Sequence, residues 1–207
     1  MSRSLNSKDW LRRHLTDPYV KLAQKDGYRS RSAYKLIEMD EENKLLKPGM
    51  TVVDLGAAPG GWSQVTARKV GGKKGRVIAI DLLEMAALPG VTFLKADFAE
   101  QAGLDAMIAA LDGHPADLVL SDMAPNLTGI TVTDQARMFA LAELALEFSR
   151  EFLKPGGDFL IKVFQGAGYP GYVKAMRLMF AKAVVKKPNA SRAESNEIYL
   201  LGKGKKT

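Results

Sequence analysis

Four aspartates, each placed where an apolar run of sequence ends, carry the clearest chemical signal in the chain. Asp54 closes the run that starts at Thr51, and Asp81, Asp97 and Asp122 follow the next apolar runs in order. A carboxylate at such a position can accept both hydroxyls of a ribose, or the amino group of a base, because its two acceptor oxygens lie side by side. Negative charge also favours a cationic ligand over a phosphate. The series therefore indicates a site for a positively charged nucleoside.

The glycine-rich sequence G-A-A-P-G-G at residues 56–61 supports this interpretation. A strand, a glycine turn and a helix open a nucleotide-binding unit, in which glycines let the backbone approach a ligand closely. Pro59 stiffens the turn where a diphosphate binder needs free amides at a helix N-terminus. Taken alone, such a turn can be purely structural, and the aspartates decide the matter. S-adenosylmethionine is a nucleoside with a sulfonium charge and no diphosphate, so we expect it as the cofactor.

One lysine lies inside an otherwise apolar strand. Lys162 falls within residues 158–163, and a buried lysine is costly unless it is paired. Two interpretations follow from the residues: a functional amine in the cleft, or a strand-end lysine that extends to solvent.

The elements that position these groups alternate between strands and helices. Strands are expected at residues 51–55, 77–80, 91–94, 117–120, 158–163, 183–187 and 197–201, and a turn at residues 154–157. Helices are expected at residues 8–15, 18–27, 32–45, 63–70, 104–111, 133–152 and 172–180. This alternation predicts an α/β fold around a mainly parallel sheet. Ligands bind such sheets at the carboxyl ends of the strands, so we expect all four aspartates to converge on one cleft.

Length and composition restrict the functional classes. A chain of 207 residues can bury a full core as one domain. It contains no cysteine, which excludes disulfides and thiol catalysis and fits a reducing cytoplasm, the expected location. His14 and His114 are too few for a histidine-based metal centre, and we expect no metal. No apolar run approaches the ~20 residues of a membrane span, so no membrane partner is expected.

Charge is divided unevenly along the chain. Residues 1–35 carry a net charge of +6, residues 36–181 a net charge of −4, and residues 182–207 a net charge of +5. Basic ends can be solubilising tails, but a division this sharp favours a polyanion-binding face. We therefore predict a basic, RNA-contacting extension at residues 1–35 and a catalytic domain at residues 36–207. Both basic ends are expected to flank the cleft.

The stretch Y-R-S-R-S-A-Y-K at residues 28–35 interleaves aromatic and guanidinium groups. Such groups can stack on bases and pair with phosphates, which predicts RNA contact. The alternative is a solvated first helical turn with two tyrosines in the core.

Several long motifs resemble one known family. D-L-G-A-A-P-G-G-W at residues 54–62, S-D-M-A-P-N at 121–126, I-K-V-F-Q-G at 161–166 and the S-R…E-x-Y ending at 191–199 are similar to the FtsJ/RrmJ (RlmE) family. The resemblance covers nearly the whole chain. It implies a Rossmann-like, seven-stranded S-adenosylmethionine-dependent methyltransferase fold, a single domain with a short basic N-terminal helical extension.

The resemblance also implies roles for individual residues. It places a catalytic tetrad on Lys35, Asp122, Lys162 and Glu197. It places cofactor contacts on Gly60, Trp62, Asp81, Asp97 and Asp122. The chain departs from the family pattern at Asn196, where bacterial members have an arginine, and this puts one RNA contact in doubt.

The activity implied is 2′-O-methylation of a uridine ribose in large-subunit ribosomal RNA, in the peptidyl-transferase A loop, by a monomer. The partner is then free ribosomal RNA or the assembled large subunit. Lys162 either takes the proton of the ribose hydroxyl or stays charged and steers the hydroxyl lone pair. Two alternatives remain: a transfer-RNA or mRNA-cap 2′-O-methyltransferase, and a non-catalytic RNA-binding ribosome-assembly factor.

Overall fold

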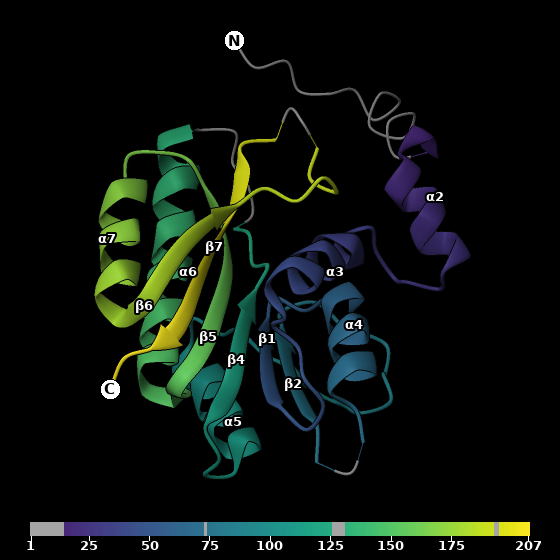
Figure 1. Cartoon of the computed structure of the whole chain (residues 1–207), viewed down its shortest axis with the longest axis horizontal. Coiled ribbons are helices and arrows are strands. Elements are labelled where there is room, and N and C mark those ends of the chain that lie inside the picture. Colours follow the sequence, from purple (N-terminus) through teal and green to yellow (C-terminus); the bar gives the residue numbers. More distant parts are fainter. Residues whose placement is uncertain (1–14, 73, 126–130, 193–194) are drawn as a thin grey trace.

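The structure of the chain is a computed structural model, which describes residues 15–72, 74–125, 131–192 and 195–207. These residues form a seven-stranded sheet flanked by helices (Figure 1). The strands are β1 (Thr51–Leu55), β2 (Arg76–Asp81), β3 (Val91–Lys95), β4 (Ala116–Ser121), β5 (Leu153–Phe164), β6 (Phe180–Lys186) and β7 (Glu197–Lys205). The helices are α2 (Pro18–Lys25), α3 (Ser32–Asn43), α4 (Gly61–Val70), α5 (Gln101–Leu111), α6 (Thr131–Phe152) and α7 (Tyr169–Met179).

The strand order is β3-β2-β1-β4-β5-β7-β6. Strands β1 to β5 pair in parallel, and β7 lies antiparallel between β5 and β6. This arrangement confirms the predicted seven-stranded α/β fold. The carboxyl ends of β1 to β5 therefore meet at one edge, and the first residues of β7 reach the same edge from the opposite direction.

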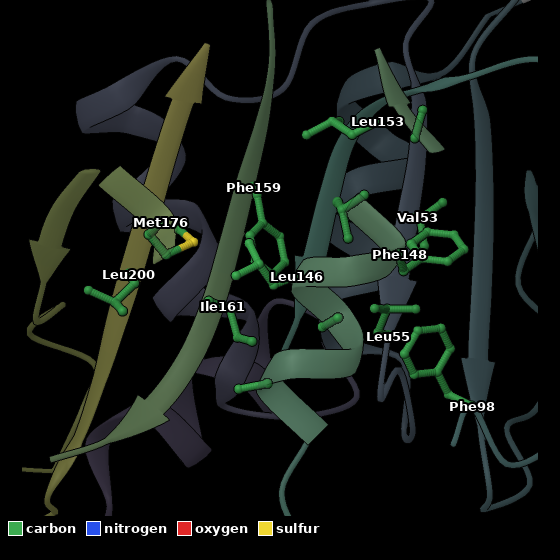
Figure 2. Packing of buried hydrophobic residues seen from close by; sticks show 14 of the residues in the cluster. Val53, Leu55, Phe98, Leu146, Phe148, Leu153, Phe159, Ile161, Met176 and Leu200 are labelled. Atoms are coloured by element: carbon green, nitrogen blue, oxygen red, sulfur yellow. The ribbon is translucent and has the colours of Figure 1, made fainter. Parts of the chain in front are cut away.

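Alternate residues of the central strands face two separate cores. Val53 and Leu55 face the side covered by α5, α6 and α7, where they join Phe148 and Phe159 (Figure 2). Val52, between them, belongs to the core under α3 and α4. Because helices cover both faces, every residue of β1 is buried, including its one charged residue.

The prediction of a turn at residues 154–157 is wrong. Strand β5 begins at Leu153, directly after α6, and the K-P-G-G sequence forms an irregular part of the strand. The pairing with β4 shifts from Ala116–Leu153 to Leu118–Asp158, so a bulge absorbs the extra residues. Gly156 takes a positive φ of 76° within this bulge, which glycine adopts without strain.

The boundary predicted after residue 35 falls inside α3. Ala33 and Leu36, on either side of it, pack into the same core as β1. Helix α2 packs on α3 through Ala23 and Tyr34. The helix expected at residues 8–15 lies outside the described residues, apart from its last residue. In the part of the chain that the structure describes, no helix is long and apolar enough to cross a membrane.

Candidate active site

A cavity of about 320 Å³ lies at the carboxyl ends of β1, β2, β3 and β4. Asp81, Asp97 and Asp122 line it, together with Phe98 and the backbone of Gly56. Its volume lies in the range of small-ligand sites, which is about 300–1,000 Å³. Three of the four strand-end aspartates therefore meet at one site, as the sequence predicted.

The backbone fixes two of these carboxylates. Asp81 accepts hydrogen bonds from the Ala58 amide at 2.9 Å and from the Leu83 amide at 2.8 Å, one on each oxygen. Asp97 accepts one from the Ala99 amide at 2.8 Å. Each carboxylate oxygen has two lone pairs, so both groups keep acceptor capacity for a ligand. A ribose and an adenine amino group fit these acceptors, and the Phe98 ring supplies an apolar surface.

Gly56 is required where β1 meets β4. Its φ is +77°, and a Cβ built on it would lie 2.6 Å from Cγ and 2.8 Å from Cα of Met123. Any side chain would push the two strand ends apart. The close backbone approach fits a bound nucleoside.

Asp54 does not line the cavity, so the predicted convergence of all four aspartates is wrong for this residue. It pairs with Ala79 inside the ladder, one residue before β1 ends, and this register turns its side chain toward α4. There it accepts a hydrogen bond from Ser63 Oγ at 2.6 Å. Complete burial raises the pKa of Asp54 to about 7, against the lowering effect of the Ser63 hydrogen bond.

Gly60 and Trp62 are not among the residues that line the cavity. The Trp62 indole is buried, donates to the Ser32 carbonyl at 2.8 Å and packs on Tyr199 with ring centroids 5.8 Å apart. Gly60 takes a φ of +108°, and a Cβ there would lie 2.8 Å from Met85 Sδ. Both residues shape the loop that forms the cavity wall, and their role as direct cofactor contacts stays a prediction.

The four residues of the predicted tetrad form two ion pairs beside the cavity. Lys35 Nζ lies 2.5 Å from Glu197 Oε1, and Lys162 Nζ lies 3.1 Å from Asp122 Oδ1. Lys162 also donates to the Asp122 carbonyl at 2.6 Å. With both lysines buried, the alternative of a solvated Lys162 at a strand end is wrong.

Tyr199 connects the two pairs, and sequence reasoning missed it as a site residue. Its hydroxyl donates to Asp122 Oδ1 at 3.1 Å, and Lys35 Nζ lies 5.6 Å from its ring centroid. The available signal was spacing, because residues two apart on a strand share a face and Tyr199 follows Glu197 by two.

Glu197 remains ionised at neutral pH. Burial raises the pKa of its carboxyl, but the charge and the hydrogen bond of Lys35 outweigh burial and hold the pKa below its ordinary value. The site therefore combines two carboxylates and two amines in matched pairs, next to a cavity that suits a cationic nucleoside.

The stretch at residues 28–35 packs within the protein. It differs from the solvated turn of the alternative interpretation, although Tyr34 is buried as that interpretation expected. The Arg29 guanidinium donates to the carbonyls of Ala86 and Ala87 at 2.6 and 2.9 Å. The Tyr34 hydroxyl donates to Asp26 at 2.6 Å, and its ring makes an edge contact with Tyr28. Fewer hydrogen-bond donors of this stretch are therefore free for RNA than the sequence suggested.

Helix α3 holds the connection between β6 and β7, which leads to Glu197. Glu38 accepts hydrogen bonds from the amides of Asn189 and Ala190 at 2.6 and 3.1 Å. Arg31, the residue immediately before α3 and about two turns before Glu38, donates to the Ala190 carbonyl at 2.7 Å. Lys35 lies between them on the same face of the helix, so one helix face holds both the connection and the carboxylate at its end.

The basic C-terminal region reaches both edges of the sheet, so the expectation that it flanks the cavity is wrong for the lysines at the end of β7. Lys187, by contrast, donates to the Glu197 carbonyl at 2.7 Å, at the active edge. Because β7 is antiparallel, Glu197 begins it at the active edge and Lys205 ends it at the opposite edge. Lys205 donates to the Leu153 carbonyl at 2.6 Å, at the start of β5. The reversed direction of one strand thus separates Lys203, Lys205 and Lys206 from the site.

A seven-stranded sheet of this order, with a carboxylate-lined cavity at the ends of its parallel strands, defines an S-adenosylmethionine-dependent methyltransferase. The profile of the family described as FtsJ-like methyltransferase matches residues 28–205. The chain therefore belongs to that family, as its motifs predicted.

Full-length relatives share more than half of its residues. Ribosomal RNA large subunit methyltransferase E of Chromobacterium violaceum is 56% identical over 206 residues, which are 100% of both chains. The protein of the same name from Methylobacillus flagellatus is 57% identical, over 98% of this chain and 97% of the relative. A crystal structure of a ribosomal RNA methyltransferase from Plasmodium falciparum has a TM-score of 0.78 at 29% identity and covers 86% of this chain and 98% of its own.

Proposed function

We propose that this protein transfers the methyl group of S-adenosylmethionine to the 2′-hydroxyl of a uridine ribose in large-subunit ribosomal RNA. The proposal rests mainly on the two ion pairs beside the nucleoside cavity, Lys35–Glu197 and Lys162–Asp122. The names of the full-length relatives support the RNA class. The proposed position is the peptidyl-transferase A loop, and the proposed setting is ribosome assembly in the cytoplasm, by a monomer.

The cofactor supplies a methyl group that its sulfonium charge has already activated. Asp81 and Asp97 hold the nucleoside through acceptor oxygens that their backbone hydrogen bonds leave available. Asp122 lines the same cavity and accepts from both Lys162 and Tyr199. It thereby joins the cofactor side of the site to the acceptor side.

Lys162 orients the ribose hydroxyl. An ammonium group has three donors, and Lys162 directs donors at the carbonyl and the carboxylate of Asp122. A remaining donor, aimed at the ribose oxygen, turns the oxygen lone pair toward the methyl group. Alignment of this kind contributes several kcal/mol to a transfer reaction. If Lys162 instead binds in its neutral form, it takes the hydroxyl proton, and a general base typically adds ~10²–10⁴-fold.

Lys35 and Glu197 set the position of the acceptor ribose. One oxygen of Glu197 accepts from Lys35, and the carboxylate retains capacity for a ribose hydroxyl. A non-catalytic assembly factor would have no need of two matched ion pairs with buried lysines, whose desolvation is costly. The arrangement therefore favours an enzyme over that alternative.

Labelled methyl transfer tests the proposal. Unmodified large subunits, free large-subunit RNA, transfer RNA and capped mRNA are incubated with labelled S-adenosylmethionine, and the modified nucleotide is mapped. We expect one 2′-O-methylated uridine in the large-subunit RNA, and labelling that is slower by about 10²–10⁴-fold with Lys162→Ala. Preferential labelling of transfer RNA or of a cap would overturn the substrate, and label on a base would overturn the reaction.

A further inference from the structure

A second depression lies at the end of the sheet opposite the cavity. It has a volume of about 740 Å³ and is formed where β1, β4 and β5 begin and β7 ends. Its charged lining consists of five lysines and two aspartates: Lys44, Lys47, Lys154, Lys182, Lys203, Asp117 and Asp158. We call this depression the lysine groove.

The two aspartates are neutralised by lysines of the groove itself. Asp117 forms an ion pair with Lys154, and Asp158 lies 3.6 Å from Lys203 Nζ. The three other lysines, Lys44, Lys47 and Lys182, are exposed, and their side chains have no carboxylate partner among the described residues. The groove thus has an excess of three positive charges, although the body at residues 36–181 is acidic overall.

Glycines keep the groove open along its length. Gly49, Gly156 and Gly204 all line it, and all have positive φ values. A Cβ built on Gly156 would meet no atom within 4 Å, and one on Gly49 would meet only Lys74 Cβ, at 3.9 Å. The lysine Nζ groups surround a surface of glycine backbone that carries no side chains. This arrangement suits a chain of phosphates, because each phosphate can bind one lysine ammonium group.

A protein partner fits the groove less well. Stable protein interfaces depend on buried aromatic or arginine anchors, and the groove lining contains neither. Association with a polyanion needs no such anchor, because released counterions supply the free energy.

We propose that the lysine groove binds the phosphodiester backbone of the RNA substrate at a distance from the reacting ribose. The inference rests on the proposed function and specifies its substrate class. Lys203 and Glu197 are six residues apart on β7, which at about 3.4 Å per residue separates the groove from the active edge by about 20 Å. The substrate is then a large, folded RNA that contacts both ends of the sheet, and a short hairpin carrying the acceptor nucleotide cannot do so.

The test compares two double variants of equal charge change. Lys47→Gln with Lys182→Gln removes two groove lysines. Lys174→Gln with Arg177→Gln removes two exposed charges from α7, outside the groove. RNA affinity is measured at several salt concentrations, without cofactor, for large-subunit RNA and for a short acceptor hairpin.

We expect the groove variant to bind large-subunit RNA about tenfold more weakly, with a salt slope lower by about 1.4–1.8, since each of the two lost phosphate contacts lowers the slope by about 0.7–0.9. Its KM for that RNA rises, whereas its kcat, its S-adenosylmethionine affinity and its hairpin affinity stay at wild-type values. The α7 variant should match wild type throughout. Replacing Lys47 and Lys182 by arginine should restore affinity.

Three results overturn the groove proposal: an unchanged salt slope in the groove variant, an equal loss with the hairpin, or tighter groove-dependent binding of polyglutamate than of RNA. Failure of the proposed function gives a different pattern. In that case groove-dependent RNA binding persists in the direct titration while the wild-type protein methylates no large-subunit RNA.

Discussion

The cofactor side and the acceptor side of the active site are assembled in different ways. On the cofactor side, Asp81 and Asp97 are each held by an amide two residues further along the chain, and Asp81 also accepts from the Ala58 amide, 23 residues earlier. On the acceptor side, the Lys35–Glu197 pair joins positions 162 residues apart, and the contact between Lys162 and Asp122 spans 40. One half of the site is set by local backbone geometry, whereas the other depends on the order and direction of the strands.

The two halves should therefore respond differently to substitution. Loss of a cofactor-side carboxylate removes ligand contacts and frees an amide near solvent. Loss of one member of an acceptor-side pair leaves a buried charge without its partner, which costs more than the removed hydrogen bond itself. Predictions that separate cofactor binding from turnover test this difference directly.

The largest effect is expected at Lys162. Lys162→Ala should reduce single-turnover methyl transfer about 10²–10⁴-fold, because the group that orients or deprotonates the hydroxyl is lost. Affinity for S-adenosylmethionine, measured by calorimetry, should change little, since Lys162 is not among the residues that line the cavity.

Lys95→Ala is a matched control for this experiment. Lys95 also lies at the end of a strand next to the cavity, but its ammonium pairs with the exposed Glu84. Lys95→Ala should keep both the wild-type rate of methyl transfer and the wild-type affinity for S-adenosylmethionine. If Lys162→Ala kept a near-normal rate in a single turnover, Lys162 would have no part in the chemistry.

The next effect concerns the aspartate that does not reach the cavity. The pKa of Asp54 is raised to about 7, so the folded protein binds this proton more tightly than the unfolded chain does. The contribution of this proton to the free energy of unfolding is then fully present below about pH 4 and is lost as the pH rises through about 7. At about 1.36 kcal/mol per unit, the loss is on the order of 4 kcal/mol.

Asp54→Asn should remove this part of the pH dependence. Urea unfolding at pH values between 4 and 8 measures it, and Asp105→Asn, an exposed change on α5, is the control. Parallel stability profiles for wild type and Asp54→Asn would show that Asp54 stays ionised in the folded state despite its burial.

The sequence indicated most of the cofactor side because its signals are local. A buried strand, a glycine turn and an aspartate at the next strand end can each be recognised within a few residues, and Asp81 and Asp97 were found in this way. Asp54 gave the same signal, but its ladder position, one residue before the end of β1, turns it toward Ser63. Only the register distinguishes the two cases.

The acceptor side was predicted from resemblance rather than from local pattern. No periodicity brings Lys35 to Glu197, and the family motifs supplied that pair. Tyr199 and Glu38 escaped notice because their partners, Asp122 and the amides of residues 189 and 190, lie far away in sequence. The lysines at the end of β7 were misplaced because strand direction decides which edge of the sheet they reach, whereas Lys186 and Lys187 of the same region lie at the active edge.

A smaller effect is expected at Asp81, on the cofactor side. Asp81→Ala should weaken S-adenosylmethionine binding by about 1.5–3 kcal/mol, or roughly 10–150-fold, the scale of hydrogen bonds to a charged group. At saturating cofactor, the single-turnover rate should remain close to that of wild type. Calorimetry on the folded variant measures the affinity, with Asp105→Ala as the control. Unchanged affinity would remove Asp81 from the cofactor site.

The smallest effect is expected at Glu38, which touches neither cavity nor tetrad but holds the amides of residues 189 and 190. Glu38→Ala frees the connection before Glu197, so the Lys35–Glu197 pair is held less firmly. Turnover should fall about 5–10-fold, the scale of one hydrogen bond of about 1–1.5 kcal/mol, with cofactor affinity unchanged. Glu38→Gln keeps an acceptor oxygen and should recover most of the rate, which a loss of charge alone would not allow. Equal losses of rate and cofactor affinity in Glu38→Ala would mean that the two halves of the site are coupled through α3, and the division between them would not hold.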